Sequence, residues 1–182
     1  GNWGGFVVKT SGTTNLNQSR THSLVNEITG VTASTGDNWY DPTYDAAGNM
    51  ATGPRPSAPK DSDANGRKFK HTYDAWHRLV KTEQSPTNTT SWTTIATYAY
   101  NGVNQRTVKV DVVANPDVQY DYYYNQKWQV VEVRKDGSVN PFEQWLWHPY
   151  YIDAPAIRYY DSDTSNGTGV VDQYFTHDAN FN

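Results

Sequence analysis

Two short stretches, YDAAGNM at residues 44–50 and YDAWHRLVK at residues 73–81, begin with the same two residues and continue in a similar way. In each, Tyr-Asp is followed by two spacer residues, a polar turn residue and a return to apolar character. Asp suits such a place because its short side chain can bond the backbone two residues on and tolerates left-handed geometry. We therefore interpret each stretch as the corner of a β-hairpin, with an aromatic residue ending the first strand.

The same pattern recurs along the chain with Asn in place of Asp. The residues predicted to build these corners are Tyr44, Asp45, Gly48, Tyr73, Asp74, Tyr100, Asn101, Tyr124 and Asn125. Between the corners lie runs of residues that favour β-strands, such as 108–112 and 128–134. In the first of these runs apolar and polar residues alternate, and short polar turns separate one run from the next. The segment 24–28 is the nearest approach to a helical pattern, but the residues after it favour a strand. We predict an all-β fold, an antiparallel meander of hairpins forming a curved sheet or strip, in one domain over residues 1–182.

The composition agrees with a sheet protein and excludes several functional classes. Only 36% of residues are hydrophobic, but there are 14 Tyr, 7 Trp and 5 Phe, whose rings can pack on one side and meet water on the other. The net charge is −4, and no run of Lys or Arg offers the footprint of a nucleic-acid binder. Its apolar stretches are too short to span a bilayer, which needs roughly 20 residues. The absence of Cys excludes disulfides and thiolate zinc sites.

Catalytic and metal sites have little support in the sequence. None of the five His residues forms an HxxxH or HExxH pair, and no G-x-S-x-G elbow is present. Carboxylates such as Glu132 and Glu143 could pair across a sugar cleft only if the fold brings them together. The segment from Asp161 to Asp172 resembles a calcium loop, but its Gly falls one place late and its last acid is Asp. We expect no enzyme activity, no cofactor and no bound metal.

Tryptophan and tyrosine side chains suggest one binding alternative. Trp128, Trp145 and Trp147 could stack on sugar rings at an exposed surface. In a sheet built from repeats, however, rows of rings on one face more often pack across strands. The sequence leaves both interpretations open and favours packing.

These motifs resemble the Rhs or YD-repeat family, which includes bacterial toxin-encapsulating shells and the extracellular barrels of teneurins. The resemblance covers most of the chain from about residue 20 and rests on the Tyr-Asp and Tyr-Asn corners together with WHPYYIDAP at residues 147–155. It implies a long hairpin-built sheet that encloses a polypeptide or acts as an adhesion scaffold. The self-cleaving aspartyl site of the toxin members does not occur here, so the resemblance implies no protease activity.

From these observations we expect a structural module located outside the cell or at its surface, a fragment of a longer repeat protein, serving in scaffolding, encapsulation or self-assembly. Its expected partners are copies of itself or other segments of the parent array. Because both ends resemble incomplete hairpins, one subunit could complete the next and form a head-to-tail filament. The alternative is an adhesion module that binds glycans.

Overall fold

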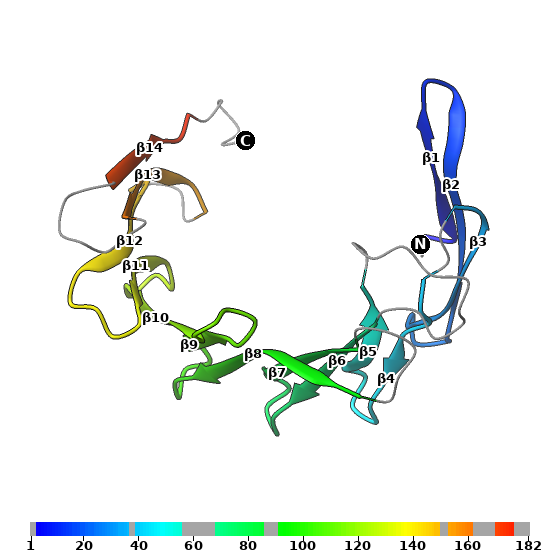
Figure 1. Ribbon diagram of the computed structural model, residues 1–182, viewed down its shortest axis with the longest axis horizontal. Helices are drawn as coiled ribbons and strands as arrows, with labels where there is room; N and C mark the ends of the chain where they lie inside the picture. The colour runs from blue at the N-terminus through cyan, green and yellow to red at the C-terminus, as the bar shows by residue number, and fades with distance from the viewer. Residues whose placement is uncertain are drawn as a thin grey trace. The chain divides into compact units, whose positions relative to one another are not determined.

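The computed structural model describes residues 3–36, 39–55, 68–85, 91–149, 153–161 and 170–176 (Figure 1). In these ranges the chain has strands, turns and bends but no helix. The strands are β1 Gly5–Thr10, β2 Thr13–His22, β3 Ile28–Thr35, β4 Thr43–Tyr44, β5 Met50–Pro54, β6 Lys68–Tyr73, β7 Leu79–Ser85, β8 Thr93–Tyr100, β9 Arg106–Asp111, β10 Val118–Tyr124, β11 Val130–Lys135, β12 Pro141–Trp147, β13 Pro155–Asp161 and β14 Val170–Tyr174. No helix of the described part is long and apolar enough to cross a membrane.

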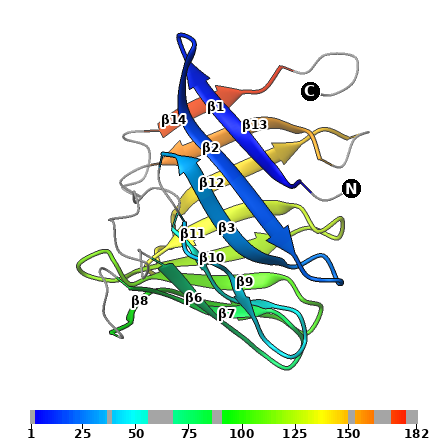
Figure 2. The same cartoon turned by 90° about the vertical axis from the view of Figure 1, so that its right-hand side faces the viewer.

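Two compact units make up the chain, Gly1–Ile95 and Ala96–Asn182. In the first unit, β1, β2 and β3 form an antiparallel sheet (Figure 2), and β4 to β7 pair in the order of the sequence. In the second unit, which begins within β8, that strand and β9 to β14 also pair antiparallel in sequence order. The predicted all-β antiparallel meander is therefore confirmed. That residues 1–182 form a single domain stays a prediction.

A register shift marks the same place in successive hairpins. Pairing slips by one residue just before the corner in five hairpins, between Thr21 and His22, Thr43 and Tyr44, Thr72 and Tyr73, Ala99 and Tyr100, and Tyr123 and Tyr124. A sixth slip precedes Trp147 at the end of β12. Such β-bulges add one residue to one strand and increase the local twist. The slip also changes which residues share a face of the sheet.

The described part of the chain buries little apolar surface. Its buried hydrophobic residues are Val31, Ala96, Val133 and Ala154. Most strand side chains are instead half-buried against their cross-strand neighbours. In the second unit, Phe142 packs against Tyr120 and Tyr160 at centroid distances of 5.6 and 5.0 Å. Because few hydrophobic residues are buried, packing between aromatic rings on different strands contributes part of the stabilisation that a larger hydrophobic core would otherwise supply.

Candidate functional site

The turn after Tyr44 is held by its own backbone and by the Asp45 carboxylate. Asp45 donates its N–H to the carbonyl of Asn49 at 2.9 Å and accepts the Gly48 N–H at 3.0 Å. One carboxylate oxygen of Asp45 also accepts the N–H groups of Ala47 and Asn49, each at 2.9 Å. Gly48 has a φ of 82°, in the left-handed region. This is a hairpin loop in which a β-turn is followed by a left-handed residue.

Five turns in the described ranges share this hydrogen-bond pattern, and we call them the corner turns. They are residues 23–27, 45–49, 74–78, 101–105 and 125–129. The fourth residue of each has positive φ, namely Asn26, Gly48, His77, Asn104 and Trp128. Asp, Asn or Ser therefore starts each turn because its side-chain oxygen can accept two backbone N–H groups.

A side-chain bond between the first and fifth residues closes each corner turn. The residue types of the two partners differ from turn to turn, but in every corner turn the first and fifth side chains are hydrogen-bonded. The pairs are Ser23 with Glu27 at 3.2 Å, Asp45 with Asn49 at 2.9 Å, Asp74 with Arg78 at 2.7 Å, Asn101 with Gln105 at 2.7 Å and Asn125 with Gln129 at 2.7 Å. A motif read as Tyr-Asp in the sequence therefore extends to the fifth turn residue.

The aromatic residue before a corner turn bonds the hairpin that precedes it. Tyr73 donates its hydroxyl to the carbonyl of Met50 at 3.2 Å, and Tyr124 donates to Arg106 at 2.9 Å. The Tyr44 hydroxyl instead accepts the N–H of Ile28 at 3.1 Å. Each of these backbone partners is the first residue of a returning strand. The aromatic residues thus join successive hairpins as well as ending strands.

Hydrogen bonding lowers the pKa of the two corner carboxylates. The side-chain and backbone bonds from Asn49 hold the pKa of Asp45 below its ordinary value, with a further contribution from the charge of His77. Burial raises the pKa of Asp74, but the bonds and positive charge of Arg78 outweigh it, so the net pKa is also lowered. Both carboxylates are therefore charged acceptors near neutral pH. In this state each carboxylate has both oxygens available to accept the bonds of its turn.

The structure separates the three tryptophans proposed for sugar binding. Trp128 is the left-handed residue of its corner turn and is 58% exposed. Trp145 and Trp147 lie on one face of β12 with centroids 6.2 Å apart, and Phe175 continues the row beside Trp145 at 6.0 Å. Trp147 donates its indole N–H to the carbonyl of Val130 at 2.7 Å. Trp147 therefore occupies the same structural place as Tyr124, one hairpin further on.

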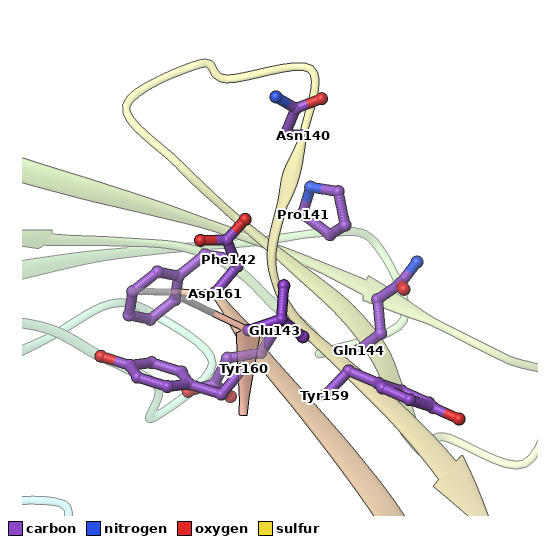
Figure 3. A pocket seen from close by; sticks show the side chains of 9 residues that line it. Asn140, Pro141, Phe142, Glu143, Gln144, Tyr159, Tyr160 and Asp161 are labelled. Carbon is purple, nitrogen blue, oxygen red and sulfur yellow. The ribbon is translucent and has the colours of Figure 1, made fainter. Parts of the chain in front are cut away.

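Two hollows lie near these residues. One, of about 450 Å³, is lined by Trp145, Trp147 and the corner turn at 125–129. The other, of about 220 Å³, lies over β12 and β13. Figure 3 shows Phe142 and Tyr160 together on one side of it and Tyr159 with Gln144 on the other. Neither hollow brings together two free carboxylates, because Glu143 pairs with Arg158.

The structure also locates the remaining residues considered for metals. Within the described ranges, no three His, Cys, Asp or Glu side chains are grouped to hold an ion. Most of the calcium-like segment, residues 162–169, lies outside the described residues. His77 belongs to a corner turn, where its Nδ1 lies 3.0 Å from Nδ2 of Asn49 in the neighbouring turn.

Sequence reasoning missed two features of the repeat. The corner turn at 23–27 follows His22 and begins with Ser23, so it lacks the Tyr-Asp signature. Asn26, a residue that tolerates left-handed geometry three places after Ser23, was the available signal. The bond of Trp147 to the first residue of β11 was also missed, since an indole N–H rather than a phenol makes it.

No family model and no curated protein matches the chain. Among solved structures, a chain in the crystal structure of TcdB2-TccC3-Cdc42 matches with a TM-score of 0.52 and 15% identity. The match covers 96% of this chain and 8% of that chain. At this identity the likeness shows the fold alone, an all-β arrangement of antiparallel strands.

Proposed function

We propose that this chain is a structural module of a Rhs or YD-repeat array, without catalytic activity, located outside the cell or at its surface. The observation that carries the proposal is the recurrence of the corner turns and their aromatic residues. In the hairpins described above, polar groups of the motif bond backbone atoms of their own turn or of the preceding hairpin. Residues engaged in this way serve the architecture. The fold likeness to a much longer chain is in keeping with a module of a larger array.

The work of such a module would be scaffolding, encapsulation or self-assembly. Self-assembly has a physical basis in β14, whose Val171 and Tyr174 are 48% and 71% exposed. An exposed edge strand offers unpaired backbone groups to another strand. The partner we propose is another segment of the parent array or a second copy of this chain, and a head-to-tail contact between copies would produce a filament.

Sedimentation velocity and electron microscopy of the full chain, across a wide range of concentration, test the assembly proposal. We expect ordered assemblies that grow with concentration. Replacing Val171 by Lys, which places a charge on the edge strand, should abolish them, whereas Val113→Lys, at an exposed residue outside the strands, should not. Monomers at every concentration would contradict self-assembly. The structural role is tested by urea denaturation of Tyr124→Phe and Tyr123→Phe, of which only the first should destabilise the chain, because the Tyr124 hydroxyl bonds the carbonyl of Arg106.

Glycan binding is the second candidate, favoured by one observation. Trp145, Trp147 and Phe175 form a row of rings beside the 450 Å³ hollow. Binding on a glycan array that Trp145→Ala removes, while the unfolding midpoint stays unchanged, would support an adhesion module. Because Trp147 also bonds the backbone of Val130, Trp145 is the better residue to change.

A further inference from the structure

Arg106 lies between two tyrosine rings on one face of the second unit. Its guanidinium carbon is 4.8 Å from the ring centroid of Tyr122 on β10 and 5.7 Å from that of Tyr98 on β8. One ring thus comes from each strand that neighbours β9. Stacking on aromatic rings fixes the plane of a guanidinium and so prepares its hydrogen-bonding edge for a ligand.

Within the ranges that the structure describes, the guanidinium of Arg106 has no carboxylate partner, unlike the other two arginines of the second unit. Arg134 pairs with Glu132 at 2.6 Å, and Arg158 pairs with Glu143. Among the described residues, the Nε of the Arg106 guanidinium is buried and donates to no side chain or carbonyl. Leaving a buried charged donor unpaired is costly, so such a group in a folded protein indicates a missing acceptor.

A second cation shares this face. Lys109 pairs with Tyr98 on one side and Tyr120 on the other, which puts it on the tyrosine-bearing face. Its ammonium lies 5.5 Å from the Tyr120 centroid and 4.0 Å from a carboxylate oxygen of Asp111, at the outer limit for an ion pair. Arg106 and Lys109 are three residues apart and would lie on opposite faces of a regular strand. The bulge at the start of β9 adds one residue between them, so both side chains lie on the same face of the sheet.

A groove of about 250 Å³ lies beside Lys109 and the ring of Tyr122, on which the Arg106 guanidinium stacks. Its lining includes Lys109, Tyr122, Val133 and Phe142. Among the described lining residues, the one carboxylate is that of Glu143, which already accepts from Arg158 and from the indole N–H of Trp145. The groove therefore combines apolar walls with the charge of Lys109, whose contact with the Asp111 carboxylate is long, and it adjoins the ring that carries the Arg106 guanidinium.

We propose that Arg106 and Lys109 form a binding site for a carboxylate of an acidic peptide segment lying in this groove. Arg106 would donate two parallel hydrogen bonds to the carboxylate, and Lys109 would add its charge. A peptide fits better than an acidic glycan for two reasons. The guanidinium already covers the faces of Tyr98 and Tyr122 that a sugar would use, and Val133 and Phe142 suit apolar side chains next to the acid.

Fluorescence anisotropy of the full chain with a labelled peptide of alternating Glu and Leu tests this site. We expect binding of that peptide and none of the matched Gln and Leu peptide. Arg106→Met should weaken binding about tenfold or more, as expected for the loss of a charge-assisted pair. Arg134→Met, an equal charge change at an arginine already paired with Glu132, should leave binding unchanged.

Two further variants change one feature of the site at a time. Arg106→Lys keeps the positive charge but removes the planar guanidinium with its paired N–H donors, and Lys109→Met removes the second cation while Arg106 stays in place. We expect both to bind more weakly than the unchanged chain and to unfold at a similar temperature by circular dichroism, so they test the site even if Arg106→Met fails to fold. Equal binding of the Glu and Gln peptides would overturn the proposal. So would equal losses in the Arg106 and Arg134 variants, or displacement of the peptide by oligogalacturonate at the same carboxylate concentration.

Discussion

The phenolic oxygen of Tyr124 lies 2.9 Å from the carbonyl oxygen of Arg106, the first residue of β9. Because Tyr124 ends β10, this bond joins the start of one returning strand to the end of the next strand. Tyr73 and Met50 repeat the relationship in the first unit. In both units, therefore, the corner aromatic contributes a contact between hairpins that the strand ladder itself does not supply.

Removing this hydroxyl should destabilise the chain measurably. Tyr124→Phe keeps the ring and leaves the Arg106 carbonyl without its side-chain donor, so we expect a loss of about 1 kcal/mol in the free energy of unfolding. Tyr123 is the matched control, since it is the adjacent tyrosine, is 45% exposed and points to the other face. Urea denaturation followed by circular dichroism measures both. If Tyr123→Phe costs as much as Tyr124→Phe, the structural role assigned to the corner aromatic is wrong.

The turn-closing pairs should be exchangeable as pairs. Asp74→Asn with Arg78→Gln converts the charged pair into the amide pair found at Asn125 and Gln129. We expect the double variant to be more stable than the sum of the two single losses implies, because partners in contact are coupled by about 0.5 to 3 kcal/mol. A double-mutant cycle in urea gives the coupling. Strictly additive losses would show that the two side chains act independently.

A glycine at His77 should stabilise its corner turn. His77 has a φ of 61°, a conformation that costs a non-glycine residue roughly 1 to 2 kcal/mol and costs glycine almost nothing. Gly48 occupies the equivalent position of the neighbouring turn. We expect His77→Gly to raise the unfolding temperature and Gly48→Ala to lower it, by differential scanning calorimetry. The same direction of change in both variants would contradict the strain argument.

Stability should fall in acid as the corner carboxylates are protonated. The pKa values of Asp45 and Asp74 are lowered in the folded chain, so the unfolded chain binds more protons between the folded value and the ordinary value of 3.8. Their contribution is therefore complete above the ordinary value and is lost as pH falls through the folded values. In Asp45→Asn with Asp74→Asn, the dependence of unfolding free energy on pH in this acidic range should be shallower. An unchanged slope would show that these carboxylates do not titrate as described.

Most of the hairpin architecture could be predicted because its signals are local. Asp45 bonds the N–H groups two and four residues ahead, so the turn needs no distant partner. The corner at Ser23 shows the limit of this reasoning, since Ser makes the same two bonds without the expected Tyr-Asp pair. The partner of a corner aromatic, such as Met50 for Tyr73, lies in the preceding hairpin. Sequence patterns that act over a few residues cannot predict such a partner, because its position depends on how the hairpins pair.

The sequence by itself determined the fold class and four of the corners, because side-chain oxygens that bond nearby N–H groups act over a few residues. Only the tertiary structure decided which side chains share a face. A single bulged residue reverses the alternation of a strand, and it places Arg106 beside Tyr98 and Lys109 instead of across the sheet from them. The bond of Trp147 to Val130 was likewise decided by pairing between strands, since it depends on the register of β11 and β12.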